Sequence, residues 1–237
     1  MFGGMKATSA GSRQVVPLGS LLLLLSCATA PPAPLCQRPL TQQGMDAEAE
    51  HHTRWMQACK ESGAANGPLP APDVTHACWY GEVLAAMGEK ALWAEGRAAY
   101  RFLWLRAFHE PVLVRLDRDK DGTGTLTAHT LDGVGGHFAG CLNRNVRRPA
   151  SKTEVAGLIS RATAAFAIPA PLPTTAPPVG ELRPDGARWV FEEVNGSERL
   201  VRDVWSPDQG PATAAYRELG LYLVKLAGFQ IPESETY

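Results

Sequence analysis

Three residues in predicted loops, His109, Asp132 and His137, are the side chains of this sequence best suited to catalysis. A histidine beside a carboxylate can act as an oriented general base, and two histidines with an aspartate could bind zinc and leave one coordination position open. However, the sequence contains no G-x-S-x-G, H-E-x-x-H or S-x-x-K motif. Ordinary turn roles explain the same residues equally well. We therefore expect a non-catalytic domain, with a metal-dependent or general-base hydrolase using these three residues as the alternative.

Asp117, Asp119 and Asp121, followed by Gly122, match the opening D-x-D-x-D-G of a calcium-binding EF-hand loop. The rest of the loop does not match, because its twelfth position holds Ala128 in place of a bidentate glutamate and both flanks have strand patterns. The segment therefore predicts a hairpin turn with a solvated acidic tip. Weak calcium binding by the three aspartates is the alternative, and no cofactor is expected.

The cysteines indicate export from the cytosol. With Cys27 set aside, four remain, an even number that allows two disulfides. We expect a bond between Cys59 and Cys78, which would close a loop of about twenty residues and stabilise the fold by roughly 3 kcal/mol. A bond between Cys36 and Cys141 follows by elimination. No two cysteines are spaced C-x-x-C, so paired thiols in an oxidising compartment are favoured over a zinc site.

The first thirty residues contain the three parts of a secretory signal peptide. Lys6 and Arg13 supply a cationic start, residues 15–25 supply an apolar core, and small residues follow at the cleavage region. The apolar core is about eleven residues long, whereas a helix needs roughly twenty to cross a bilayer. The segment is therefore predicted to be a leader and not a permanent transmembrane anchor.

Two routes of processing compete at the end of this leader. Cleavage after Ala28-Thr29-Ala30 fits the A-x-A pattern, but Pro31 would follow the cut, where it lacks an N–H and distorts an extended substrate. Leu24-Leu25-Ser26-Cys27 closely resembles the lipobox of bacterial lipoproteins. That resemblance implies a diacylglyceryl thioether and an acylated amine on Cys27, and several acyl chains make membrane attachment lasting. Because Ala28 follows the lipidated cysteine, the resemblance also implies that the protein lies on the periplasmic face of the outer membrane.

Charge and composition limit the partners of the mature chain. Loss of residues 1–26 removes Lys6 and Arg13 and leaves 21 basic against 24 acidic side chains, a net charge of −3. No basic block could neutralise a run of phosphates, so nucleic acid is not an expected partner. The expected partners are membrane lipid, through Cys27, and another envelope protein, peptidoglycan or a small ligand bound by a non-catalytic module.

The chain is predicted to have three parts: a signal peptide over residues 1–26, a flexible tether over 27–54 and a single domain over 55–237. The tether is rich in proline and polar residues and poor in large apolar ones. The adjacent His51 and His52 fall at its end. Because no third ligand accompanies them at helical or strand spacing, they are interpreted as solvated linker residues.

Helices are predicted over residues 76–87, over 152–166 and from Pro211 to Gly228. Strands are predicted over 100–105, 112–116 and 125–131, where they form a meander, and in a hairpin over 187–205. Ser151 and Glu154 have the spacing of a capping box for the second helix. The order of elements predicts an α+β fold, with an antiparallel sheet of about five strands and helices on one face.

The hairpin turns at Asn195-Gly196, the pair best suited to a two-residue type I′ turn. That turn places these residues opposite one another: Val194 and Ser197, Glu192 and Arg199, Arg188 and Asp203, and, on the core face, Phe191 and Leu200. Opposite charges then match across the strands, which supports the pairing.

Several short motifs resemble those of an uncharacterised group of exported bacterial proteins. They are residues 100–106, Phe108-His109-x-Pro111, the glycine-rich run 131–136, Asp185-Gly186-Ala187-x-Trp189 and residues 203–207. The resemblance covers roughly residues 76–230, implies a stand-alone domain, and transfers no activity. The glycine-rich run lacks the lysine of a phosphate cradle, so it is interpreted as a loop whose glycines supply positive φ values.

Overall fold

The computed structural model describes residues 42–61, 74–133, 138–169, 186–208 and 210–237. Its sheet has six antiparallel strands in the order β4-β3-β2-β1-β5-β6, which confirms the α+β class with one strand more than predicted. The strands are β1 (Ala99–Arg106), β2 (Val112–Arg118), β3 (Gly124–Leu131), β4 (Leu142–Ala150), β5 (Ala187–Asn195) and β6 (Glu198–Trp205). The additional strand is β4. It lacks an apolar alternation because it is an edge strand whose side chains are mostly exposed.

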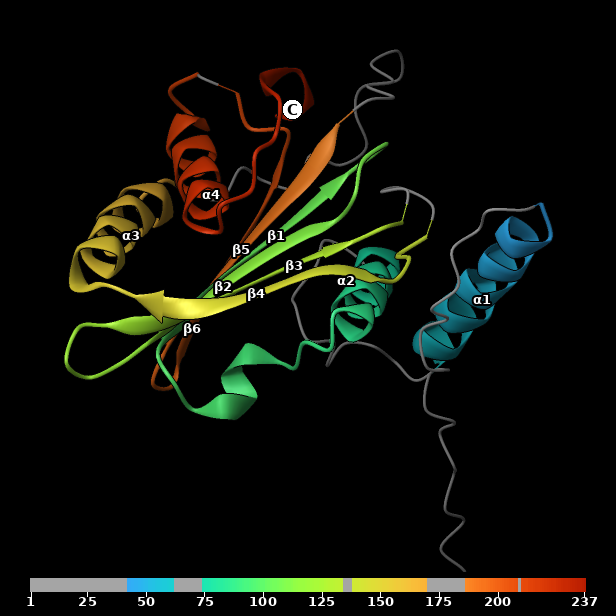
Figure 1. The fold of residues 1–237 in the computed structure, drawn as a ribbon, viewed down its shortest axis with the longest axis horizontal. Helices are drawn as coiled ribbons and strands as arrows, with labels where there is room; N and C mark the ends of the chain where they lie inside the picture. Colours follow the sequence, from blue (N-terminus) through green and yellow to red (C-terminus); the bar gives the residue numbers. More distant parts are fainter. Residues whose placement is uncertain (1–41, 62–73, 134–137, 170–185, 209) are drawn as a thin grey trace, which may run out of the picture.

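Helices α3 (Lys152–Phe166) and α4 (Ala214–Leu226) cover one face of the sheet (Figure 1). Beneath them, aromatic rings of β1 and β5 pack together, with centroids 4.8 Å apart for Phe102 and Phe191 and 4.7 Å apart for Trp104 and Trp189. Gly220 allows α4 to approach this layer, since a Cβ there would lie 2.3 Å from the Trp189 ring. The aromatic alternation of β1 therefore forms the centre of the main core.

Helix α2 (Val74–Ala86) covers the opposite face, where its Val83 and Leu84 pack against Leu103 and Leu113 (Figure 1). Helices thus lie on both faces of the sheet, and the prediction that they lie on one face is wrong. The physical reason is found in β1, which is buried at all of its positions. A strand that is apolar on both sides needs cover on both sides.

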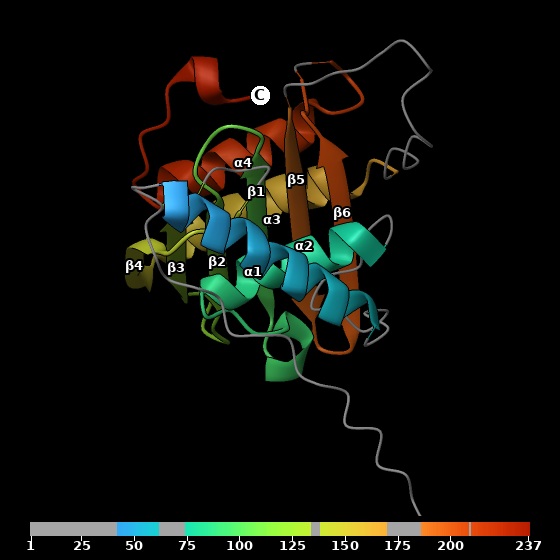
Figure 2. The same cartoon turned by 90° about the vertical axis from the view of Figure 1, so that its right-hand side faces the viewer.

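Helix α1 (Gln42–Glu61) packs on the outer side of α2, away from the sheet (Figure 2). Residues 42–54 are therefore helical, and the prediction of a flexible tether is wrong for them. His51 is buried as well, contrary to the expectation of a solvated linker residue. With Trp55 and Cys59 it forms a buried stripe at intervals of four residues, which is how a mostly polar helix can dock.

The predicted capping box at the start of α3 is present. Glu154 N donates to Ser151 Oγ at 3.3 Å, and Ser151 N donates to Glu154 Oε2 at 2.8 Å. Hydrogen bonds from Arg148 and from the Ser151 backbone hold the pKa of Glu154 at about 2. Helix α4 begins at Ala214 and not at Pro211, because the preceding residues form a separate turn.

The β5–β6 hairpin forms, but its register differs from the prediction by two residues. The turn is Gly196-Ser197, so Asn195 lies opposite Glu198 and Phe191 lies opposite Arg202 instead of Leu200. Gly196 has a φ of 64° and Ser197 has no positive φ. That combination fits a type II′ turn, which takes glycine at its first central position, whereas type I′ needs positive φ at both.

A shift of two residues leaves each side chain on its predicted face of the sheet. The expected charge pairs therefore form diagonally, with Arg199 Nε 2.8 Å from Glu192 Oε1 and Arg188 Nη1 3.3 Å from Asp203 Oδ1. Leu200, predicted to lie in the core, is 43% exposed because β6 is an edge strand.

Candidate functional site

His109 lies in the loop between β1 and β2 and contacts the C-terminal segment, defined here as residues 229–237. Its Nδ1 is 2.7 Å from the hydroxyl oxygen of Tyr237, and its Nε2 is 3.7 Å from Glu235 Oε2. Both ring nitrogens therefore face the C-terminal segment, and His109 fastens that segment to the end of the sheet.

Asp132 follows β3 and is hydrogen-bonded to Cys141, the residue that precedes β4. Its Oδ1 accepts a hydrogen bond from Cys141 N at 2.7 Å, and its own N–H donates to Cys141 O at 2.9 Å. His137, the third candidate, lies outside the described residues. Within the described ranges, no group of three His, Cys, Asp or Glu residues is arranged to hold a metal, so no such group includes His109 or Asp132.

The three aspartates of the predicted acidic turn have separate roles. Asp117 is buried on β2, with its Oδ2 3.1 Å from Arg115 Nη2. Asp119 N donates to Thr123 O at 2.9 Å, and Asp121 Oδ1 accepts from the Thr123 N–H at 2.9 Å. The β2–β3 turn is therefore held by its own hydrogen bonds, and these aspartates belong to no metal-holding group in the part of the chain that the structure describes.

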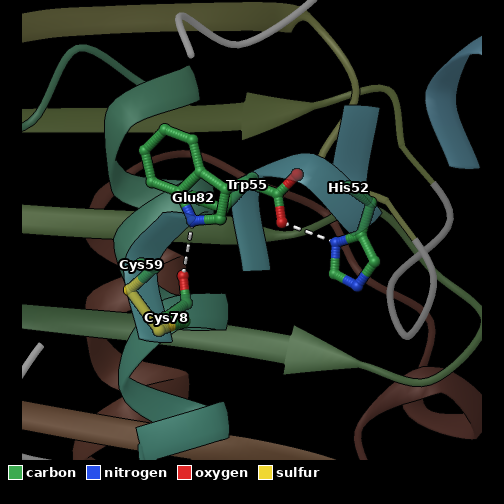
Figure 3. Close-up of a disulfide and its surroundings, with 5 residues drawn as sticks. All are labelled: His52, Trp55, Cys59, Cys78 and Glu82. Carbon is green, nitrogen blue, oxygen red and sulfur yellow. Dashed lines mark hydrogen bonds and ion pairs between the residues drawn. A yellow bond between two sulfur atoms is a disulfide. The ribbon is translucent and has the colours of Figure 1, made fainter. Parts of the chain in front are cut away.

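The predicted disulfide between Cys59 and Cys78 is present (Figure 3). The two Cα atoms are 5.7 Å apart, and the bond joins the end of α1 to α2. Cys141 is disulfide-bonded as well. Its predicted partner Cys36 and the predicted lipidation site Cys27 both precede the first described residue.

Polar contacts surround this disulfide at the interface of α1 and α2 (Figure 3). Trp55 Nε1 donates to Cys78 O at 3.0 Å, and His52 Nδ1 lies 2.7 Å from Glu82 Oε2. His51 is buried, and its Nε2 has no hydrogen-bond partner among the described residues. Burial lowers the pKa of His51, against the attraction of Glu82. The interface therefore holds a neutral histidine whose protonation would oppose docking of α1.

A row of charged side chains, here called the charged row, crosses the sheet on the side that faces α2. Its members are Arg115 and Asp117 of β2, Arg101 of β1, Glu192 of β5, Arg199 of β6, His129 of β3 and Glu89, which follows α2. At its centre Arg101, which is 1% exposed, donates to Glu192 Oε2 at 2.5 Å and lies 3.6 Å from Glu89. Each arginine has a carboxylate neighbour, as buried charges require.

Glu89 joins the two halves of the charged row, with Arg115 Nη1 3.1 Å and His129 Nε2 3.6 Å from its carboxylate. Burial alone would raise the pKa of Glu89, but the nearby His129 and the two arginines lower it below its ordinary value. Glu89 is therefore ionised at neutral pH. Sequence reasoning missed this row. Arg101 lies among mainly apolar residues of β1, and a buried arginine at such a position indicates that a buried acid lies close to it.

The C-terminal segment is held against the body by polar contacts near its end. Arg217 of α4 donates through Nη2 to Thr236 Oγ1 at 2.7 Å, and Trp189 Nε1 donates to Tyr237 O at 3.1 Å. Arg106 Nη1 lies 3.1 Å from Glu235 Oε2. Together with His109, these residues fix the segment beside α4.

A cavity of about 510 Å³, widely open to solvent, lies between the end of α4 and the C-terminal segment. Its apolar walls are Leu221 and Val224 of α4 and Phe229, Ile231 and Pro232 of the segment. This volume lies within the ~300–1,000 Å³ typical of small-molecule sites, which are mainly apolar with few polar groups. Sequence reasoning predicted the helix from Pro211 to Gly228 and missed the cavity, because no local pattern predicts that the chain beyond Gly228 returns along α4.

No known family model matches this chain, and no curated protein matches it. Among the residues that the structure describes, no helix is both long and apolar enough to cross a bilayer. The cavity and the contacts that fix its wall are therefore the basis for interpreting the site.

Proposed function

We propose that this protein is a bacterial lipoprotein whose lipidated Cys27 anchors it to the periplasmic face of the outer membrane. Its folded domain is a non-catalytic binding module of the cell envelope. The Cys59–Cys78 disulfide supports export, since such bonds persist in oxidising compartments. The anchor would precede α1 in the chain, and the disulfide then links the anchored end to the domain.

The cavity between α4 and the C-terminal segment is the observation that carries the binding role. Burying apolar ligand surface there would contribute about 25 cal/mol per Å². Arg106, Trp189 and Arg217 already fix the C-terminal segment that forms one wall of the cavity. Ligand binding would therefore cost little conformational entropy in this segment. A small apolar ligand therefore fits this site better than the other partners expected from the sequence.

The candidate catalytic residues support the same role. His109 contacts the C-terminal segment, which forms one wall of the cavity. Asp132 accepts a hydrogen bond from the N–H of Cys141, the residue that precedes β4. Both side chains are thus engaged in maintaining the architecture. The binding proposal explains their environment without a reaction.

Photoaffinity labelling of the full-length protein in isolated cell envelopes tests this proposal. The probe is an uncharged long-chain alcohol with a diazirine in its chain and an alkyne for capture. We expect adducts on α4 and the C-terminal segment, mapped by peptide mass spectrometry and suppressed by excess unmodified alcohol. Leu221→Trp or Ile231→Trp fills the cavity and should remove most of these adducts.

A matched control is Ala156→Trp, which adds the same ring at an exposed residue that lines a separate cavity beside α3. This variant should label like the unchanged protein, and an unchanged midpoint of urea unfolding verifies the fold of each variant. Adducts spread evenly over the surface, or undiminished in both cavity-filling variants, would contradict the binding role of this cavity.

A further inference from the structure

We infer that the cavity takes a single-chain amphiphile with an anionic head group, such as a long-chain carboxylate. This inference rests on the proposed binding function and specifies its ligand. It follows from three features of the site: an apolar base, unpaired cations near the rim, and a wall that is fixed before the ligand arrives.

The base and the rim of the cavity differ in polarity. Val224 and Phe229 are buried at its base, whereas Lys225 and Gln230 are exposed at its rim. Each methylene of an alkyl chain that leaves water and lies on the base would tighten binding by about fourfold. Its polar head would then lie at the rim, within reach of solvent.

The charges near the rim favour an anion. Lys225 is the only ionised residue among those that line the cavity, and it has no ion-pair partner in the described part of the chain. The guanidinium of Arg144 lies over the Phe229 ring, 5.9 Å from its centroid, and adds a second cation beside the cavity. No acidic side chain lines the site, so a cationic head group would meet Lys225 without a lining carboxylate to compensate it. Glu233, the residue after Pro232, is exposed and does not line the site.

One feature could favour a cation instead, because the carbonyl end of a helix carries partial negative charge. At the end of α4 that charge is already compensated, since Arg148 Nη2 donates to Leu226 O at 2.8 Å. Lys225 also lies in the last turn of α4. The net electrostatic preference of the rim is therefore for a negative head group.

Three photoreactive probes with the same diazirine chain and a carboxylate, an alcohol or a trimethylammonium head test the inference on the full-length protein in cell envelopes. We expect adduct yield in the cavity, relative to adducts elsewhere on the chain, to rank carboxylate, alcohol, ammonium. A partly exposed ion pair of about 0.2–1 kcal/mol corresponds to roughly a 1.4- to 5-fold preference. Lys225→Glu should reverse the order of the carboxylate and ammonium probes, and Arg144→Glu should weaken the preference.

Lys120→Glu is the matched control, because Lys120 is exposed in the distant β2–β3 turn. It should leave the ranking unchanged. Equal yields for the three heads, or an unchanged ranking in Lys225→Glu, would overturn the anionic head group while leaving the binding function intact. Absence of cavity adducts with all three probes would instead contradict the binding function itself.

Discussion

Arg101 is the residue whose environment most constrains this fold. It lies on a central strand, is almost completely buried, and donates both to Glu192 and to Lys90 O at 2.7 Å. Glu89 is also close to it. Removing the guanidinium would leave two buried carboxylates short of a cation, and an uncompensated buried charge is far more costly than the loss of an exposed pair.

We therefore predict that Arg101→Met lowers the free energy of unfolding by about 3–5 kcal/mol. Arg54→Met is the matched control, because Arg54 forms an exposed pair with Glu50 at 3.2 Å on α1. That change should cost no more than about 1 kcal/mol. Urea unfolding followed by circular dichroism measures both values. Similar losses in the two variants would show that the charged row does not depend on Arg101.

At the scale of elements, α1 lies outside the main core and packs on α2 in a small cluster of its own. Its buried side chains are His51, Trp55 and Cys59, and it packs on α2 and not on the sheet. In proteins most of the stability of a helix comes from tertiary packing of its buried face and not from its own propensity. Its position therefore depends on the disulfide and on the few contacts around it.

Replacing Cys59 and Cys78 together by serine should release α1 while the sheet stays folded. We expect trypsin to cleave at Arg54 and Lys60 much faster than in the unchanged protein, with the fragment from α2 onwards remaining protected. The reason is that the disulfide bridges α1 and α2, whereas the main core lies between the sheet and α3 and α4. Equal protection of α1 with and without the disulfide would contradict this dependence.

Protonation of His51 should weaken the same interface. Burial lowers the pKa of His51 from its ordinary 6.5; Glu82 opposes the shift, while Arg54 and His52 reinforce it. Its contribution to docking is thus fully present above pH 6.5 and is lost as the pH falls toward the lower folded value. Hydrogen exchange of α1 amides should therefore accelerate, relative to the sheet, between about pH 7.5 and about pH 5. His51→Phe should remove this dependence, and its persistence would exclude His51 as the cause.

Local patterns predicted most elements correctly. The alternation of β1, the capping box of α3 and the hairpin of β5 and β6 all depend on residues close in sequence. Edge strand β4 was missed because an exposed polar strand has no such pattern. The hairpin register was wrong because Gly196 supports either turn type, and only the three-dimensional structure selects between them.

The candidate site depends on contacts between distant parts of the chain, which no local pattern contains. Arg101 and Glu192 are separated by 91 positions, and His109 and Tyr237 by 128. From the sequence, His109 was identified as a candidate general base or zinc ligand. Its role in holding the C-terminal segment follows only from the fold.

At the scale of the whole molecule, helix α1 and the cavity lie on opposite sides of the sheet. Helix α1 lies beyond α2, whereas the cavity lies beside α4 on the other face (Figures 1 and 2). In the proposed arrangement the lipid on Cys27 is joined to the domain through α1 and not through the elements that line the cavity. The ligand could then come from the periplasm or from the membrane surface.

The mass of the amino-terminal peptide of the mature protein, recovered from the membrane fraction, determines whether Cys27 is lipidated. We expect a chain that starts at Cys27 and carries a diacylglyceryl thioether and an acylated amine. An unmodified chain that starts at Pro31, or an uncleaved chain recovered with the cytosol, would contradict it.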